Sequence, residues 1–140
     1  QPLLGRRAEK VVAAREGQAG TVQAALLPVS SSPADGAGAL AGLLARKAPR
    51  AVFCSNDMLA AGVLFECARR RIDVPGRLAV MGFADLPIAV GIEPSLTSVQ
   101  VHATEMGQRA GELLLGRLAG DTVHERIVDL GYAVIERASA

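Results

Sequence analysis

The chain has 140 residues, of which 50% are hydrophobic and 21% are charged, and its formal net charge is +1. This composition is typical of one globular domain or of part of a larger one. A face that binds nucleic acid usually carries clustered Lys and Arg, so the near-neutral charge argues against DNA binding by this segment. With one Tyr, three Phe and no Trp, the core must consist of Ala, Leu and Val, which suits helix-on-sheet packing and disfavours base stacking.

The cysteines and histidines give no sign of metal or redox chemistry. Cys54 and Cys67 lie in apolar surroundings without CxxC spacing, which predicts two buried, reduced thiols in a cytoplasmic protein. His102 and His124 are isolated from other candidate metal ligands. No GxGxxG motif follows a strand, no P-loop or GxSxG motif occurs, and the apolar runs are shorter than the roughly 18 residues of a membrane span. We therefore expect no metal, no cofactor and no enzymatic activity.

The first part of the chain is expected to contain a helix, a strand and a second helix. Residues 5–19 carry charged residues, Val and Ala at helical spacing, and residues 21–29 have the composition of a short strand. A run of three serines then leads into a strong helix start, with Ser32 as N-cap and Pro33 as the first helical residue. The leucine spacing that follows predicts an amphipathic helix ending near Lys47.

The middle of the chain has the pattern of a strand–helix–strand unit. Residues 50–54 form a short apolar run, residues 58–71 predict a long apolar helix, and residues 77–82 form a second short apolar run. In such a unit the two strands are parallel neighbours that are joined by a right-handed crossover. The basic end of the helix complements the negative end of its dipole and is interpreted as a solvated helix terminus.

The last part of the chain continues the alternation of helices and strands. Two prolines bracket a short irregular or helical piece at residues 87–94, and residues 96–101 alternate like a strand. Residues 104–119 predict a second clear helix, and residues 125–130 and 132–137 predict two strands hinged at the glycine between them. The whole pattern predicts an α/β fold.

Short polar side chains follow both strands of the central unit. Residues 55–57 read Ser-Asn-Asp after the first strand, and residues 83–85 read Phe-Ala-Asp after the second. Because ligands collect at the carboxyl ends of parallel strands, this edge is the expected binding site. Asn56 can donate and accept hydrogen bonds, which suits a hydroxyl-rich ligand. Asp57 is better explained as the N-cap of the next helix. For Asp85, a helix cap and a ligand contact remain equally open.

Five motifs carry a resemblance to a known family. They are Asn56-Asp57 followed by Met-Leu-Ala-Ala-Gly, Val74-Pro75, Gly82-Phe83-Ala84-Asp85, Pro94-Ser95-Leu96-Thr97-Ser98-Val99 and the closing Arg137-Ala138-Ser139. In order and spacing they resemble the lactose-repressor/galactose-repressor (LacI) family of bacterial transcription regulators, over roughly residues 33 to 139. The Gly-Phe-Ala-Asp step and residues 129–132, Asp-Leu-Gly-Tyr, are similar to the gluconate-operon repressors of that family.

The resemblance implies a periplasmic-binding-protein-like (type I) fold, a three-layer arrangement with a parallel sheet, in which two lobes close on a sugar or sugar acid. Residues 1–100 would form the C-terminal lobe, residues 101–122 would cross to the N-terminal lobe, and residues 123–140 would return. In the family, a DNA-binding headpiece, a hinge helix and most of the N-terminal lobe precede this segment. They are expected to be absent from this chain, so that it comprises mostly the C-terminal lobe and operator DNA is bound only through the missing headpiece. A homodimer is also implied, and no membrane contact.

The resemblance also assigns candidate ligand contacts. Asn56 matches the effector-contacting Asn of the family, and Ala84 stands where sugar-binding members carry an effector-contacting Asp. The loss of that carboxylate would suit an anionic ligand, because two buried like charges repel. Arg15 is a candidate for the family's effector-binding Arg, although one residue too few separates it from the following Gly. The expected ligand-binding residues are Asn56, Phe83, Ala84, Asp85, Arg15 and His102, the last near the crossing between the lobes.

These features predict the effector-sensing part of a transcriptional repressor, with a sugar or sugar acid such as gluconate as its ligand. A periplasmic sugar-binding protein of a transporter, which has the same fold, is the alternative. A small α/β enzyme is disfavoured, because the strand ends carry no acid/base pair. Without its partner lobe, the last helix would expose Met106, Leu113, Leu114 and Leu118, so we expect it to repack or to be covered by a second molecule.

Overall fold

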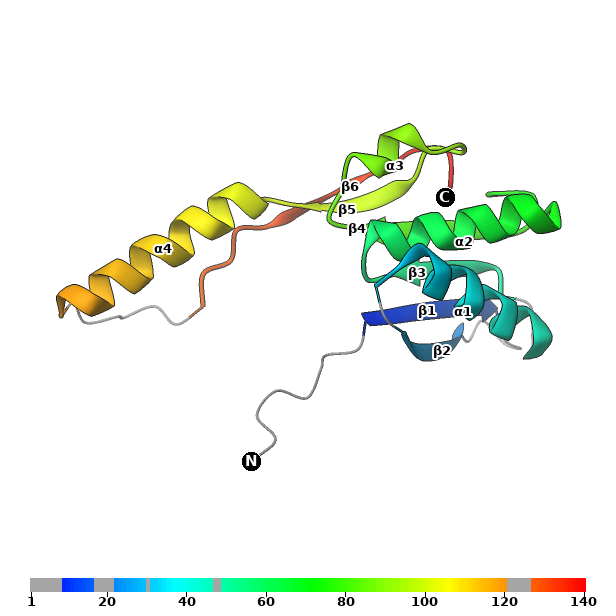
Figure 1. Cartoon of the computed structure of the whole chain (residues 1–140), viewed down its shortest axis with the longest axis horizontal. Helices are drawn as coiled ribbons and strands as arrows, with labels where there is room; N and C mark the ends of the chain where they lie inside the picture. The colour runs from blue at the N-terminus through cyan, green and yellow to red at the C-terminus, as the bar shows by residue number, and fades with distance from the viewer. Residues whose placement is uncertain (1–8, 17–21, 30, 47–48, 121–126) are drawn as a thin grey trace, which may run out of the picture.

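Strands and helices alternate over most of the chain, as the sequence predicts. The computed structural model describes residues 9–16, 22–29, 31–46, 49–120 and 127–140. The strands in these residues are β1 (Glu9–Glu16), β2 (Val22–Val29), β3 (Ala51–Cys54), β4 (Ala79–Phe83), β5 (Thr97–Val101) and β6 (Tyr132–Ile135). The helices are α1 (Pro33–Arg46), α2 (Asp57–Arg70), α3 (Ile88–Gly91) and α4 (Ala103–Ala119) (Figure 1).

The strands form one mixed sheet in the order β2-β1-β3-β4-β5-β6. The predicted unit of β3, α2 and β4 is present, and β3, β4 and β5 are parallel neighbours. The sheet is not parallel throughout, however, because β1 pairs antiparallel with both β2 and β3, and β6 pairs antiparallel with β5. Successive strands such as β1 and β2, joined by a short connection, can only pair antiparallel. The expected α/β class is confirmed, with a mixed sheet in place of a parallel one.

Two expectations from local sequence patterns are wrong. The helix expected over residues 5–19 is strand β1 wherever the structure describes it, since residues 5–8 and 17–19 lie outside the described part. β1 pairs on both sides, with β2 and β3, and this pairing overrides the local spacing. The strand expected at residues 125–130 is also not formed in its described part, residues 127–130. The backbone turns at the end of this segment. Gly131 has a φ of 72°, and its N–H donates to Asp129 Oδ1 at 2.8 Å, which stabilises the turn.

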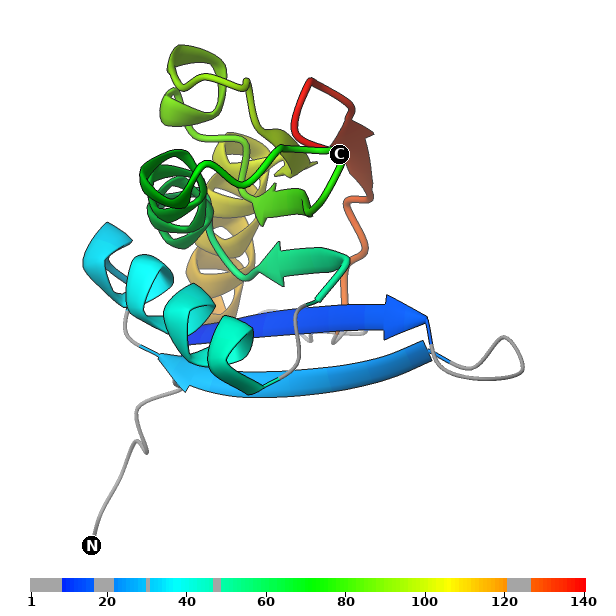
Figure 2. The same cartoon turned by 90° about the vertical axis from the view of Figure 1, so that its right-hand side faces the viewer.

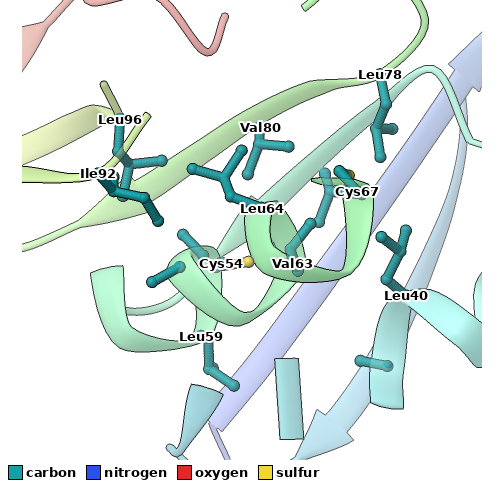
Figure 3. Close-up of a cluster of buried hydrophobic side chains, with 14 of the residues drawn as sticks. Leu40, Cys54, Leu59, Val63, Leu64, Cys67, Leu78, Val80, Ile92 and Leu96 are labelled. Carbon is teal, nitrogen blue, oxygen red and sulfur yellow. The ribbon is translucent and has the colours of Figure 1, made fainter. Parts of the chain in front are cut away.

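The core lies between the sheet and helices α1 and α2, which cover one of its faces together with α3 (Figure 2). Residues of β3 and β4 alternate, so Val52, Cys54 and Val80 are buried under the helices. Figure 3 shows how leucine, valine and cysteine side chains fill this space. On the opposite face Phe53 and Met81 are only half-buried. In the described part of the chain, α1, α2 and α3 thus form a helical layer on one face of the sheet. This is one of the two helical layers in the three-layer fold that the resemblance implies.

The start of α1 confirms the predicted cap. Ser32 Oγ accepts the backbone N–H of Asp35 at 3.2 Å, and the Asp35 carboxylate accepts the Ser32 N–H at 3.2 Å. The two residues therefore satisfy each other's backbone donors, as in a capping box. This cap fixes where α1 begins.

Helix α4 projects away from the sheet and contains no buried residue (Figure 1). Met106, Leu114 and Leu118 are exposed, as predicted, whereas Leu113 is half-buried and Leu115 is exposed in addition. Within the described residues, no helix combines the length and the apolar character that crossing a membrane requires.

Both cysteines are buried free thiols, as expected. Burial, with a smaller contribution from the charge of Asp57, raises the pKa of Cys54 to about 12. Burial, with a smaller contribution from Glu66, raises the pKa of Cys67 to about 11. Because the thiolate is the reactive form, a disulfide reagent at pH 8 should label the native protein at least roughly tenfold more slowly than the urea-unfolded protein.

The same shifts predict how stability depends on pH. Both folded-state pKa values lie above the ordinary value of 9.0, so the unfolded thiols ionise first as the pH rises. The contribution of the two thiols is complete below about pH 9 and is lost progressively as the pH rises from there through the folded-state pKa values of about 11 and 12. Urea midpoints measured from pH 7 to 10.5 should fall only at the alkaline end. Labelling at equal rates in the native and unfolded states would show that the thiols are not buried.

Candidate functional site

The carboxyl ends of β3, β4 and β5 meet at one edge of the sheet, where the polar residues singled out in the sequence also lie. At the end of β3, Asn56 has extended backbone geometry and is the N-cap of α2. Its Oδ1 accepts the backbone N–H of Leu59 at 2.8 Å. The cap is therefore Asn56, and the expectation that Asp57 serves as the cap is wrong. The cap falls on Asn56 because the helix begins one position earlier than predicted.

Asp57 is instead a fully buried carboxylate that ties the strand ends together. Its Oδ1 accepts the hydroxyl of Ser98 on β5 at 2.6 Å, and its Oδ2 accepts the backbone N–H of Leu86, beyond β4, at 2.6 Å. A Cβ at Gly82 would lie 2.1 Å from Asp57 Oδ1, so only glycine leaves room for this carboxylate. Asp57 thus links α2, the loop after β4 and the start of β5.

The loop after β4 has an unusual backbone. Ala84 and Asp85 have φ values of 99° and 54°, in the left-handed region. For residues other than glycine such geometry costs about 1–3 kcal/mol each and persists only where the surroundings enforce it. Here the Ala84 N–H donates to Val99 O at 2.8 Å and the Asp85 N–H donates to Ser98 Oγ at 3.2 Å. The backbone of the turn is therefore fastened to β5.

The side chain of Asp85 is also held firmly. Gln100 Nε2 donates to its Oδ2 at 3.0 Å, and Arg137 Nη1 lies 2.7 Å from its Oδ1. Among the described residues Oδ1 has no partner of hydrogen-bond geometry, so the contact with Arg137 is an ion pair. The side chains of Asp85 and Arg137 are only 10% and 16% exposed. Of the two interpretations left open for Asp85, the cap is wrong, because the N-cap of α3 is Pro87.

A hollow of about 750 Å³ opens between this turn, the end of β5 and the start of α4. It is lined by Ala84, Asp85, Gln100, Val101, His102, Ala103, Thr104, Glu105 and Gln108. Three of the six predicted site residues, Ala84, Asp85 and His102, therefore come together here. The lining offers amide, hydroxyl and carboxylate groups, which suit a ligand with many hydroxyl groups. In the described part of the chain, no group of three or more His, Cys, Asp or Glu could hold a metal ion.

The other three predicted residues lie apart from the lining. Asn56 is occupied in part by its capping role, and Phe83 is the half-buried last residue of β4. The backbone of Arg15 lies at the far end of the sheet, since its neighbour Ala14 pairs with Ala51 at the amino end of β3. Whether any of the six contacts a ligand stays a prediction.

Several residues of the hollow, and one residue that supports it, were not predicted from the sequence. Thr104, Glu105 and Gln108 share the first turns of α4, and Gln100 precedes that helix on β5. These residues lie close in sequence to His102, which was already predicted to lie near the site, and this closeness could have pointed to them. Arg137 lies far along the chain from Asp85, and no local pattern connects the two.

Comparisons with known proteins agree with this architecture. The family model described as periplasmic binding protein-like domain matches residues 4–140. The HTH-type transcriptional regulator GntR of Pseudomonas aeruginosa is 41% identical over 88 residues, which are 63% of this chain and 26% of that protein. The chain thus spans about a quarter of the length of this relative. These similarities confirm the resemblance to LacI-type regulators.

Solved structures give the same result. The transcription regulator GntR from Chromobacterium violaceum has a TM-score of 0.72 and 38% identity, over 80% of this chain and 42% of that one. A LacI family transcriptional regulator from Arthrobacter sp. FB24, solved in complex with lactose, has a TM-score of 0.68 and 27% identity, over 79% of this chain and 42% of that one. The fold is therefore shared with transcription regulators.

Proposed function

Because this chain belongs to the family of periplasmic binding protein-like domains, we propose that it is the effector-sensing part of a cytoplasmic bacterial transcriptional repressor. The observation that carries this proposal is the hollow at the carboxyl ends of β4 and β5, lined with hydrogen-bonding side chains. The similarity to transcription regulators supports a sensing role rather than catalysis.

The proposed ligand is a sugar acid, with gluconate as the first candidate. The gluconate-repressor motifs of the sequence and the similarity to GntR regulators support this choice. Ala84 contributes no carboxylate to the hollow, and Arg137 balances the charge of Asp85. An anionic ligand would therefore meet less repulsion from this turn than a pair of free carboxylates would produce.

In the same proposal, ligand binding shifts the balance between open and closed arrangements of two lobes in a dimer. Residues 1–100 would belong to the C-terminal lobe, residues 101–122 would cross to the other lobe, and residues 123–140 would return. The exposed apolar side chains of α4 are consistent with burial against such a lobe or a second molecule. Operator DNA would be bound by a separate headpiece.

A sugar-binding protein of a transporter is the second candidate, since such proteins have the same periplasmic-binding-protein-like fold. The names of the similar proteins, which are transcription regulators, favour the first candidate. The gene distinguishes the two directly, because a helix-turn-helix encoded ahead of Gln1 supports the regulator and a signal peptide supports the transporter protein.

Calorimetric titration of the protein encoded by the gene tests the ligand. Gluconate, 2-ketogluconate and gluconate 6-phosphate are compared with glucose and lactose. We expect a sugar acid to bind, and we expect Gln108→Ala in the lining to weaken binding about tenfold, the effect of losing one hydrogen bond to a charged group. Arg109→Ala, on the same helix but outside the lining, is the control and should leave the affinity unchanged. Binding of neutral sugars alone would exclude the sugar acid, and a folded protein that binds none of the five would contradict the proposal that the hollow binds a sugar or sugar acid of this kind.

A further inference from the structure

The turn that forms one wall of the hollow does not hold its shape by local preference. Ala84 and Asp85 both have left-handed backbone geometry, and neither is glycine. Short polar residues such as Asp adopt this geometry more readily than Ala does. The neighbours of the turn must therefore keep it in place, and the shape of the hollow depends on them.

Two side chains from distant parts of the sequence converge on the Asp85 carboxylate from β5 and from the segment after β6. Gln100 lies on β5 and donates to Oδ2 at 3.0 Å. Arg137 follows β6 by two residues and places Nη1 2.7 Å from Oδ1. Each carboxylate oxygen thus has its own partner, one on β5 and one in the segment that follows β6.

Arg137 is itself fixed in place on the start of β5. Its Nη1 donates to Leu96 O at 2.8 Å, and its backbone N–H donates to Thr97 Oγ1 at 2.9 Å. With a side chain that is only 16% exposed, the guanidinium group has little freedom to follow a moving carboxylate. It therefore acts as a fixed point for the Asp85 side chain.

We propose that Arg137 and Gln100 are positioning residues of the effector site, which clamp the Asp85 carboxylate and so hold the Ala84–Asp85 turn in the shape that lines the hollow. The inference rests on the proposed function for its biological meaning, because it assumes that the hollow binds the effector. β5 leads directly into α4, and β6 leads back from it toward Arg137. The clamp thus joins the turn to both strands that connect α4 with the sheet.

Amide hydrogen exchange measured by NMR tests the clamp without any ligand. Gln100→Met removes one donor at nearly constant volume, and Arg137→Gln removes the charge. We expect each to speed exchange at Ala84, Asp85 and Leu86 by roughly tenfold or more relative to Ala60 in α2. This is the scale of one lost hydrogen bond to a charged group for Gln100→Met, and of one lost, largely buried ion pair for Arg137→Gln. Arg109→Gln removes an exposed ion pair, to Glu112 on the surface of α4, and should leave all four amides unchanged.

Rescue separates positioning from general stability. In Asp85→Asn/Arg137→Gln both charges of the ion pair are removed, so no buried charge is left without a partner. Protection of the turn amides from hydrogen exchange should therefore recover in part compared with Arg137→Gln alone. Equal acceleration at the turn and at Ala60, or no acceleration in either single variant, would overturn the proposal. Gluconate titration of the same variants is read separately. Loss of turn protection with no gluconate binding in the parent protein would leave the clamp standing and reject the proposed ligand.

Discussion

Gly62→Ala is expected to destabilise the protein by about 3 kcal/mol or more, because helices α1 and α2 cross with their backbones in contact. A Cβ at Gly62 would lie 1.9 Å from Pro33 O, and a Cβ at Gly36 would lie 2.1 Å from Leu59 O. In each case the obstacle is backbone, which cannot rotate aside as a side chain can. The helices would have to separate, and the buried leucines between them would lose contact. Gly36→Ala should therefore have a similar effect.

Two other glycines of α1 provide the matched controls. A Cβ at Gly38 or Gly42 would meet nothing within 4 Å. Alanine at these positions should stabilise α1 by about 0.5–1 kcal/mol each, since glycine loses more conformational freedom in a helix. Urea unfolding followed by far-UV circular dichroism measures all four variants. A Gly62→Ala variant within about 1 kcal/mol of the parent would contradict the close helix crossing.

The central strands and helices could be predicted from sequence because their signals are local. The serine cap before Pro33 and the apolar runs on both sides of α2 each lie within a few residues of the element that they predict. β1 could not be predicted in this way. Its residues are compatible with a helix, and only pairing with β2 and β3, the latter far along the chain, selects a strand.

The site shows the same division between local and distant information. The rule that ligands collect at strand ends pointed to residues 83–85 from their position after β4, and Ala84 and Asp85 line the hollow. It could not show that Asp85 meets Gln100 and Arg137, because these contacts depend on the register of β5 and β6. The confusion between Asn56 and Asp57 had a different cause. Both residue types cap helices well, so one residue of uncertainty in the helix start exchanges a cap with a buried carboxylate.

Asp57→Ala is the second substitution with a large expected effect, about 3 kcal/mol or more in the free energy of unfolding. The fully buried carboxylate accepts the Ser98 hydroxyl and the Leu86 N–H, both at 2.6 Å. Its removal leaves both donors without this acceptor and opens a cavity beside Gly82. Asp35→Ala, which removes the half-buried partner of Ser32 at the start of α1, is the control and should cost only about 1 kcal/mol.

A double-mutant cycle with Ser98→Ala shows whether the effect arises from the inferred contact. The single Ser98→Ala variant should cost about 1–3 kcal/mol, because it leaves one buried carboxylate oxygen without its donor. In Asp57→Ala/Ser98→Ala the Ser98 hydroxyl and the carboxylate that accepts it are both removed, so neither is left buried without its partner. The combined loss of stability should therefore be smaller than the sum of the single losses by about 1 kcal/mol. Additive losses in urea unfolding would mean that the two side chains stabilise the fold independently. In that case Asp57 would not be the group that ties β5 to the start of α2, and the strand ends around the hollow would need another explanation for their arrangement.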